Sequence, residues 1–315
     1  MRNSFVAAAA ASLATLAAFA APAMAQYPDK PVSFVVPFPP GDPEDVLTRM
    51  IAEDFQKEYG TAAAVVNKPG GGGGPFPGAV EVANAPADGY TVGSFVIDVP
   101  VVGPYIDIPE LNPNPFEPLG IFLTYPFVIV AYGDAPYDTM EELAEYARSN
   151  DVVLGHFGNF LIPTQVTMAL AKSMDFSYSA DAAFDALDCN TLASGDVDVM
   201  NGTLQSLLPC IDDIKVLATV TDKRIPLVPD APTVGEIEPD LDVALWNGLF
   251  VHKDVPQEAR DAIVAVAKKT MESGRAQGFA TETGTGVYWQ GAEEAAARIA
   301  KDEETLGRIE AMLAE

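Results

Sequence analysis

The sequence predicts an α/β protein with two lobes around a central cleft, each lobe a mainly parallel sheet flanked by helices. Short apolar runs alternate with helical stretches, which is the pattern of a parallel sheet covered on both faces. The pattern occurs twice, and a chain of this length is expected to form two domains. The last stretch has helices but no strands of its own to cover, so we expect it to return to the first lobe. Two lobes joined by such crossings form a hinge with a cleft.

Residues 1–25 have the layout of a secretory signal peptide. Arg2 precedes a long run of Ala, Leu, Phe and Val, and Pro22 is followed by Ala-Met-Ala, which predicts cleavage after Ala25. A membrane anchor would need roughly 20 strongly apolar residues, whereas this run is mostly alanine. We therefore expect an exported, soluble protein of 290 residues (315 minus 25).

The first lobe is expected to begin with residues 26–125. Asp42 suits the N-cap of a helix, Pro43 suits its first position, and Gly60 suits its end. The expected elements, in order, are a strand at 32–36, a helix at 43–59, a strand at 62–66, a short helix at 78–85, a strand at 88–97 and an extended, proline-rich connection at 104–118.

The second lobe is expected at residues 126–247, and residues 248–315 are expected to return to the first lobe. Thr139 and Glu142 form a capping-box pattern that predicts the start of a helix. The expected elements, in order, are a strand at 127–133, this helix, a strand at 152–159, a helix containing Val166 and Leu170, a helix around 181–194, strands at 196–200 and 214–220, and terminal helices at 257–272 and 292–314.

Two cysteines occur, Cys189 and Cys210. In an exported protein such a pair can close a disulfide, which stabilises the fold by roughly 3 kcal/mol on the loop-entropy argument. Two thiols alone are a poor metal site. We expect a disulfide and no metal.

The mature chain is strongly acidic. Without Arg2 it has 17 Lys and Arg (18 minus 1) against 45 Asp and Glu, a formal charge of −28. This balance argues against nucleic acid and anionic membranes as partners, because binding phosphates needs clustered Lys and Arg. Most of these acids are expected to lie on a solvated surface.

The stretch NKPGGGGGPFPG, residues 67–78, contains five consecutive glycines. It is too short and too enclosed for a flexible linker. It lacks the Gly-x-x-x-x-Gly-Lys-Ser/Thr spacing of a phosphate-binding loop. The use that we favour is an anion nest, in which main-chain amides converge on a carboxylate. The turn PFPPGD, residues 37–42, follows a neighbouring strand at the same edge of the sheet, where ligands bind in open α/β folds.

These segments also resemble a known family. YPDKPVSFVVPFPPGDPEDVLTRMIAEDF, NKPGGGGG followed by GAVEVANAPADGYT, GDVDVM, ATVTDKRIPLVPDAPTVGE and WNGLFVHKDVP are similar to signatures of the substrate-binding proteins of tripartite tricarboxylate transporters, the Bug family. The resemblance covers nearly the whole mature chain. It implies a periplasmic, two-lobed binding protein that delivers a small organic carboxylate to the permease subunits of a membrane transporter. We also expect a monomer without a cofactor.

The resemblance also implies the ligand-binding residues. Main-chain amides of the two turns would hold one carboxylate, and second-lobe residues would close over the rest. The expected set is Phe38, Pro40, Gly41, Asp42, Asp45, Gly71, Gly72, Gly73, Gly74 and Phe76 in the first lobe, and His156, Gly158, Asn159, Thr164, Asn201, Gly202 and Thr203 in the second.

Asp42 departs from the family pattern, which usually has a second glycine there. It crowds Glu44 and Asp45 at a helix start that is expected to receive an anion, and like charges at this spacing repel. Two interpretations stay open. Asp42 caps the helix while Asp45 points away from the cleft, or Asp42 meets a positive group and the ligand is a zwitterion or a carboxylate carried with a cation.

Enzymatic alternatives have little support in the sequence. It contains no Gly-x-Ser-x-Gly and no His-Glu-x-x-His, and His156 and His252 lie in unrelated contexts. We therefore expect a binding protein rather than an enzyme. The alternatives are a ligand-sensing protein for a membrane signalling receptor and a small-carboxylate hydrolase.

Overall fold

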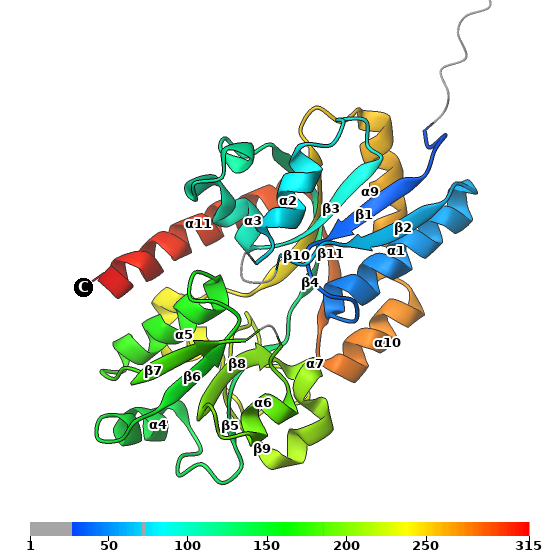
Figure 1. Ribbon diagram of the computed structural model, residues 1–315. Coiled ribbons are helices and arrows are strands. Elements are labelled where there is room, and N and C mark those ends of the chain that lie inside the picture. Colours follow the sequence, from blue (N-terminus) through cyan, green and yellow to red (C-terminus); the bar gives the residue numbers. More distant parts are fainter. Residues whose placement is uncertain (1–26, 71–73, 185, 315) are drawn as a thin grey trace, which may run out of the picture.

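The computed structural model describes residues 27–70, 74–184 and 186–314 of the chain. They form two β-sheets with flanking helices, one above the other in Figure 1. The six-stranded sheet, with strand order β11-β4-β10-β3-β1-β2, defines the first lobe, and the five-stranded sheet, with order β7-β6-β8-β5-β9, defines the second. The two-lobed α/β fold expected from the sequence is confirmed. The expected signal peptide lies outside the described residues.

The first lobe begins with alternating strands and helices, because each apolar run is followed by a turn and an amphipathic stretch. Its elements up to the crossing into the second lobe are β1 (Val32–Val36), α1 (Pro43–Tyr59), β2 (Ala63–Asn67), α2 (Phe76–Ala83), β3 (Thr91–Val96), α3 (Asp98–Val101), the 3-10 turns η2 (Gly103–Tyr105) and η3 (Pro109–Leu111), and β4 (Phe116–Thr124). The proline-rich connection is therefore built from short turns and leads into a strand that the sequence analysis does not assign.

The second lobe occupies the middle of the chain. Its elements are β5 (Phe127–Tyr132), α4 (Met140–Ala147), β6 (Val153–His156), α5 (Ile162–Ser173), β7 (Ala180–Ala183), α6 (Cys189–Ala193), β8 (Val199–Thr203), α7 (Leu204–Leu207), the 3-10 turn η4 (Leu208–Asp213), β9 (Ile214–Thr219), α8 (Val234–Ile237) and the 3-10 turn η5 (Pro239–Leu241).

The chain then returns to the first lobe. This part contains β10 (Trp246–His252), α9 (Gln257–Met271), α10 (Gly274–Thr283), β11 (Gly286–Gly291) and α11 (Ala292–Ala314). The expectation that this last part has no strands of its own is wrong. β10 lies between β3 and β4, and β11 extends the same sheet beyond β4.

Parallel pairing is confined to part of each sheet, so the mainly parallel pairing expected from the sequence is corrected. β1 pairs in parallel with β2 and β3, and β6 pairs in parallel with β7 and β8. The remaining pairs are antiparallel. The reason is the crossing between lobes: β10 enters the first sheet from the second lobe and runs opposite to β3 and β4. β5 enters the second sheet in the same way.

The helix expected around 181–194 is only partly present. Residues Ala180–Ala183 form the edge strand β7, and α6 begins at Cys189. The alanine-rich sequence favours a helix, but pairing with β6 satisfies the backbone groups of these residues in the sheet. The expected disulfide between Cys189 and Cys210 is present, with the two Cα atoms 5.9 Å apart, and it ties α6 to η4.

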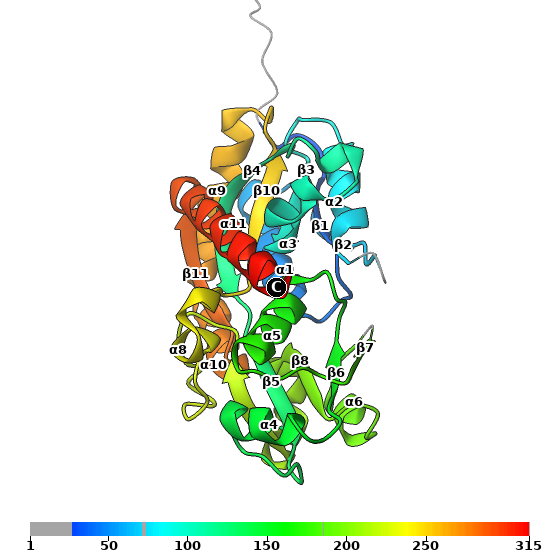
Figure 2. The ribbon, with the colours of Figure 1, turned by 90° about the vertical axis from the view of Figure 1, so that its left-hand side faces the viewer.

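One hydrophobic core extends from the first lobe into part of the second. Phe34 and Ile309 belong to the same buried cluster as Val166 and Leu170 of α5. A smaller cluster, which includes Met200, fills the other face of the second sheet. Figure 2 shows α11 running from the first lobe down to α5, so the last helix contacts both lobes. The contact of α11 with the second lobe is not expected from the sequence, which predicts only a return to the first lobe.

Candidate functional site

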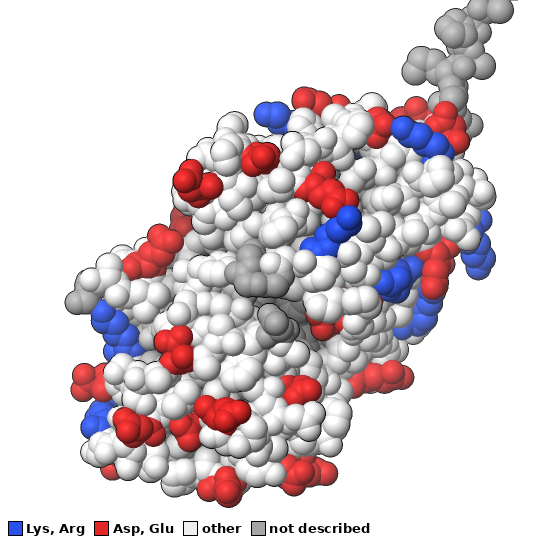
Figure 3. Space-filling model, in the orientation of Figure 1, with Lys and Arg blue, Asp and Glu red and all other residues white. Residues whose placement is uncertain are grey.

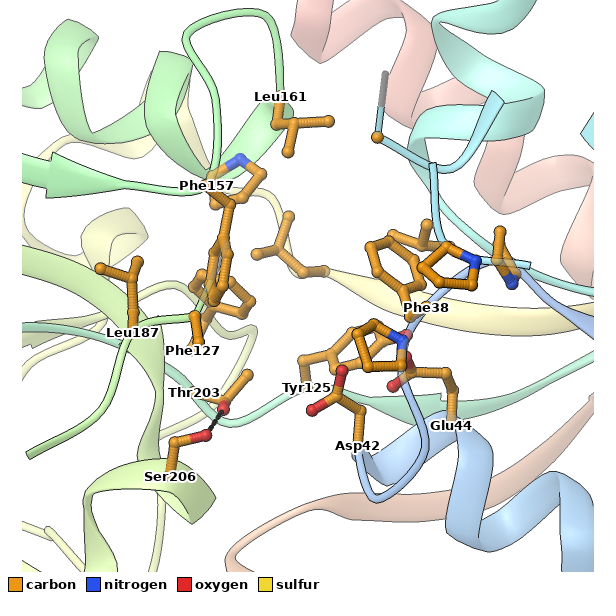
Figure 4. A pocket seen from close by; sticks show the side chains of 18 of the residues that line it. Phe38, Asp42, Glu44, Tyr125, Phe127, Phe157, Leu161, Leu187, Thr203 and Ser206 are labelled. Atoms are coloured by element: carbon orange, nitrogen blue, oxygen red, sulfur yellow. Dashed lines mark hydrogen bonds between the residues drawn. The ribbon is translucent and has the colours of Figure 1, made fainter. Parts of the chain in front are cut away.

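A cavity of about 550 Å³ lies between the two sheets and is lined by residues of both lobes. Its walls face each other in Figure 4, with Phe38, Asp42, Glu44 and Tyr125 on one side and Phe127, Phe157 and Leu187 on the other. The first-lobe lining is Pro37, Phe38, Pro39, Asp42, Glu44, Pro69, Gly70, Gly74, Val96, Asp98 and Tyr125, and Leu245 lines the cavity from the crossing that leads back to this lobe. The second-lobe lining is Phe127, Phe157, Leu161, Pro163, Phe184, Ala186, Leu187, Asp188, Thr203 and Ser206.

The turn after β1 is held in place by Asp45, which does not line the cavity. The Asp45 carboxylate accepts hydrogen bonds from the amide of Gly41 (2.9 Å), from the guanidinium of Arg49 (2.9 Å) and from the side-chain amide of Asn67 (2.8 Å). Burial alone would raise the pKa of Asp45, but these hydrogen bonds leave it below its usual value. Asn67 also donates to the carbonyl of Phe38 (3.0 Å), which fixes the turn to the end of β2.

This network corrects one expectation about the first turn. The amide of Gly41 is expected to be free for a ligand, but it already bonds to the protein's own carboxylate. The carbonyl of Gly41 accepts a hydrogen bond from Gln205 of the second lobe (3.2 Å), and Pro40 is exposed. The turn reaches the cavity through Phe38 and the two prolines beside it, and through the residue that begins the next helix.

Asp42 and Glu44 place two carboxyl groups on the first-lobe wall. Asp42 is the N-cap residue of α1, as expected, but its side chain makes no capping hydrogen bond and lines the cavity. Burial raises the pKa of Asp42 to about 6, and the nearby charge of Asp45 adds to this effect. Burial, reinforced by Asp42, raises the pKa of Glu44 well above its usual value.

Glu44 is 2% exposed, and its Oε2 atom has no hydrogen-bond partner among the described residues. Beside it lies Tyr125, whose hydroxyl accepts a hydrogen bond from the Asn247 side-chain amide (3.1 Å). Asn247 in turn accepts from the hydroxyl of Ser94 (2.9 Å). This buried chain of polar groups holds the Tyr125 hydroxyl at the cavity wall.

Asp98 links the two lobes. Its side chain, on a residue that is 2% exposed, accepts a hydrogen bond from the backbone amide of Ile162, the first residue of α5 (3.0 Å). Burial raises the pKa of Asp98 to about 6, although this hydrogen bond opposes the change. A second contact between lobes is made by the rings of Phe76 and Phe160, whose centroids are 6.2 Å apart.

The second-lobe wall is mainly aromatic and aliphatic. The rings of Phe127 and Phe157 meet edge to face, with centroids 6.1 Å apart. Two hydroxyls, those of Thr203 and Ser206, bond to each other at 3.0 Å and lie on this wall (Figure 4). Asp188 lines the cavity too, but its carboxylate caps α6 by accepting from the amides of Asn190 and Thr191.

Several expected second-lobe residues point away from the cavity. His156 is buried and its Nε2 lies 2.9 Å from a carboxylate oxygen of Asp181 on the neighbouring strand. Asn201 donates to the hydroxyl of Thr167 in α5 (3.0 Å). Because successive residues of an extended chain face opposite ways, Phe157 reaches the cavity while His156 does not, and of the three expected β8 residues only Thr203, at the end of the strand, lines the cavity.

The expected site residues thus fall into three groups. Those that line the cavity are Phe38, Asp42, Gly74 and Thr203. Those that lie elsewhere are Pro40, Gly41, Asp45, Phe76, His156, Gly158, Asn159, Thr164, Asn201 and Gly202. Gly71, Gly72 and Gly73 lie outside the described residues.

Sequence reasoning misses the aromatic wall, Glu44 as a lining residue, and Asp98. A usable signal exists for Asp98, because it follows β3 at the same sheet edge as the two glycine-containing turns. Tyr125 and Phe127 could be found from the crossing itself, since the segment that joins two lobes passes the cleft. The pairing of Phe157 with Phe127 depends on tertiary structure and leaves no local pattern.

The charged side chains that line the cavity in the described part of the chain are all acidic. Among its described lining residues are four carboxyl groups and no Lys, Arg or His. In the described part of the chain, no group of three or more His, Cys, Asp or Glu side chains is placed to hold a metal ion. Elsewhere the acids are scattered over the face shown in Figure 3, with some basic residues between them.

Two lobes of mixed α/β structure, joined by crossings and enclosing a cavity lined from both sides, define a solute-binding protein of the periplasmic type. The chain belongs to the tripartite tricarboxylate transporter family of receptors, TctC, whose model matches residues 47–313. Proteins of this family are periplasmic binding receptors rather than enzymes. No helix in the described part of the chain is long and apolar enough to cross a membrane.

Known proteins similar to this chain agree with that assignment. The UPF0065 protein in the tcbD-tcbE intergenic region of Pseudomonas sp. strain P51 is 27% identical over 263 residues, 78% of this chain and 75% of the relative. The periplasmic binding protein BugD is 27% identical, with a TM-score of 0.72 over 90% of this chain and 96% of BugD. R. palustris Rpa4515 with adipate shows the same fold at 21% identity, with a TM-score of 0.79 over 91% and 98% of the two chains.

Proposed function

We propose that this protein captures a small organic carboxylate between its lobes in the periplasm and delivers it to the permease of a tripartite tricarboxylate transporter. The observation that carries the proposal is the cavity of about 550 Å³, which both lobes line and which has room for a small organic molecule. Membership of the receptor family supports the transport role, and the adipate in Rpa4515 supports the ligand class.

The proposed site has a polar and an apolar part. The Thr203 and Ser206 hydroxyls and the Tyr125 hydroxyl can donate hydrogen bonds to a carboxylate. The rings of Phe38 and Phe127 can cover the carbon skeleton. Gly70 keeps the second turn compact, because a Cβ atom there would lie 2.2 Å from the carbonyl oxygen of Gly74.

We also propose how the lobes are divided and joined. Residues 27–125 and 246–314 make the first lobe and residues 126–245 make the second, so the return crossing comes two residues earlier than expected, because Trp246 and Asn247 already pair with β4 and β3. The two crossing segments run side by side, since the amide of Tyr125 donates to the carbonyl of Leu245 (2.8 Å). This paired segment is the proposed hinge.

Binding and delivery can be tested separately. The purified mature protein should be titrated calorimetrically with adipate and other small carboxylates, and the solute released on denaturation should be identified by mass spectrometry. We expect a carboxylate that raises the melting temperature and is not turned over. Product formation would contradict a pure binding role. Loss of uptake of the identified solute on gene deletion tests delivery, and a mature protein beginning at Gln26 tests export.

A further inference from the structure

We propose that the solute selected by this cavity carries a positively charged nitrogen, which Asp42 and Glu44 bind at the first-lobe wall. This inference rests on the proposed function, because the solute carries the captured carboxylate as well as the charged nitrogen. The ligand class is therefore a zwitterionic amino-carboxylate with an apolar skeleton, rather than a plain mono- or dicarboxylate.

The distribution of charge in the cavity favours a ligand with a cationic group. Of the four carboxyl groups that line the cavity, Asp188 caps α6 and Asp98 bonds to the amide of Ile162. Asp42 and Glu44 are left, side by side at the start of α1. A plain carboxylate bound beside them would add a third acidic group at close range, and no lining Lys, Arg or His of the described chain would offset it.

The unpartnered Oε2 atom of Glu44 also favours a ligand with a cationic group. The residue is 2% exposed and lines the cavity, and its Oε2 atom has no hydrogen-bond partner among the described residues, although Tyr125 and the backbone of Glu44 itself interact with the carboxyl group. A buried acceptor without a partner is costly and uncommon in folded proteins. An ammonium group in the cavity would supply the missing donor as well as the opposite charge.

Helix capping, an internal ion pair and a bound metal each fail to account for these two acids. Asp42 makes no capping hydrogen bond. The nearest cation of the same helix, Arg49, is held by Asp45 and Asn67 outside the cavity lining. In the described chain no metal-holding group includes Glu44. An organic cation is the remaining partner of suitable chemistry.

The aromatic lining suits the same ligand. The rings of Phe38, Tyr125, Phe127 and Phe157 lie around the space in front of Asp42 (Figure 4). The faces of aromatic rings attract cations and also pack on hydrocarbon. One set of rings can therefore cover both the carbon skeleton and the charged nitrogen, while the Thr203 and Ser206 hydroxyls remain for the carboxylate.

The proposal predicts the sign of the coupling between binding and protons. The titratable groups that line the cavity with Asp42 are Glu44, Asp98, Tyr125 and Asp188, and Asp45 lies close to Asp42 at the start of α1. Burial raises the pKa of Asp42 to about 6. A cation bound there favours the ionised form, so binding releases protons and the affinity rises with pH. A plain carboxylate has the opposite effect and binds with proton uptake.

Matched probes separate these alternatives. Adipate, 6-aminohexanoate and 1,6-diaminohexane share a six-carbon skeleton but carry two carboxylates, one of each charge, or two ammonium groups. 3-Phenylpropanoate, phenylalanine and phenethylamine form an aromatic set of the same design. Each is titrated calorimetrically into the mature protein at about pH 5.5 and about pH 8, in buffers of different ionisation enthalpy, so that proton release is measured directly.

The expected result is that a zwitterion binds roughly tenfold or more tighter than the plain acid of its set, releases protons, and binds more tightly at the higher pH. Asp42→Asn and Glu44→Gln should each weaken zwitterion binding by roughly tenfold. The same substitutions should strengthen or spare the binding of the plain acid. Glu145→Gln, on the exposed surface of α4, changes the net charge equally and should have no effect. A cooperative thermal unfolding transition of each variant shows that the variant is folded.

The outcomes distinguish this inference from the proposed function. A plain acid that binds tightest, with proton uptake, overturns the inference and leaves carboxylate capture intact. A diamine or phenethylamine that binds tightest supports the nitrogen site and overturns carboxylate capture. Failure of every nitrogen-bearing probe overturns the inference, as does equal zwitterion binding by the wild type and both variants.

Discussion

Glu44 and Asp98 are buried acids that face a cavity instead of a basic side chain. Each is 2% exposed, and burial raises the pKa of both carboxyl groups. Most buried charges in proteins are paired, because removing a charge from water is costly. At these two residues the fold accepts that cost, which is typical of a binding site rather than of a structural core.

The raised pKa of Asp98 predicts how stability changes with pH. A carboxyl group with a folded-state pKa of about 6 favours the folded state below its unfolded pKa, and this contribution is lost as the pH rises through about 6. The ligand-free protein should therefore melt at a higher temperature near pH 5 than near pH 8. Below about pH 4, the protonation of Asp45, whose pKa is lowered, reverses the trend.

Asp98→Asn isolates this effect, because an amide oxygen can still accept the hydrogen bond from Ile162. The variant should be more stable than the wild type near pH 8, by up to roughly 3 kcal/mol, and should show a flatter pH profile. Thermal unfolding across this pH range measures both. A variant that is less stable at every pH would show that the ionised carboxylate stabilises the lobe contact.

Asp45 is the opposite kind of acid, since its carboxylate is fully partnered. Asp45→Ala should destabilise the protein by roughly 2 to 4 kcal/mol, because Arg49, Asn67 and the amide of Gly41 all lose their partner. Glu53→Ala, on the same helix, removes an exposed ion pair with Arg275 and should cost less than about 1 kcal/mol. Denaturant unfolding compares them, and equal losses would contradict the structural role of Asp45.

For single residues, the sequence predicts the place of a residue in its element better than the direction in which its side chain points. It identifies Asp42 correctly as the N-cap position, but only the structure shows its carboxyl group at the cavity. The family resemblance implies that His156 lies at the ligand. The side chain faces Asp181 instead, since the backbone alternation that sends Phe157 to the cavity turns His156 away.

Among the elements, α6 and the disulfide form a small unit that supports one cavity wall. Leu187 and Asp188, which directly precede α6, line the cavity, and Cys189 joins α6 to η4. The paired substitution Cys189→Ser and Cys210→Ser should lower the free energy of unfolding by roughly 3 kcal/mol.

The same substitution should also weaken binding of the tightest-binding probe several-fold, because α6 is no longer covalently joined to η4. Calorimetry gives the affinity and denaturant unfolding gives the stability. Reduced wild-type protein is the matched control and should behave like the double variant. Unchanged affinity in both would show that α6 keeps its position without the disulfide.

The predictability of the elements follows from their local patterns. β1 and α1 are predicted closely, because a continuous apolar run and a capped amphipathic stretch are visible in the sequence. β7 is mistaken for a helix, since four residues of Ala and Asp carry no strand signal until β6 pairs with them. β10 and β11 depend on strands far away in the chain, which local reasoning does not reach.

For the whole molecule, the sequence predicts two lobes but not the contacts that hold them together. The side-chain amide of Gln205 donates to the carbonyl of Gly41 across the cleft (3.2 Å). Gln205→Ala should weaken probe binding by a factor of roughly 2 to 10, because one neutral hydrogen bond between the lobes is lost. Its melting temperature without ligand should be nearly unchanged.

Calorimetry and small-angle scattering test this prediction together. The wild type should become more compact on binding, and the Gln205→Ala protein should need more ligand to reach the same state. Gln165→Ala, which removes a side-chain contact within the second lobe, is the control. A variant with wild-type affinity would show that the Gln205 contact is not coupled to ligand capture.

The last helix adds a constraint on how the lobes can move. α11 extends from the first sheet to α5, and the Lys172 ammonium group of α5 lies 3.5 Å from the carbonyl oxygen of Leu313 (Figure 2). Any opening of the cleft must slide or tilt this helix along α5. A small environment-sensitive dye at the C-terminal end would thus sense occupancy optically, whereas an affinity tag or a fused protein placed there would disturb the very motion being studied.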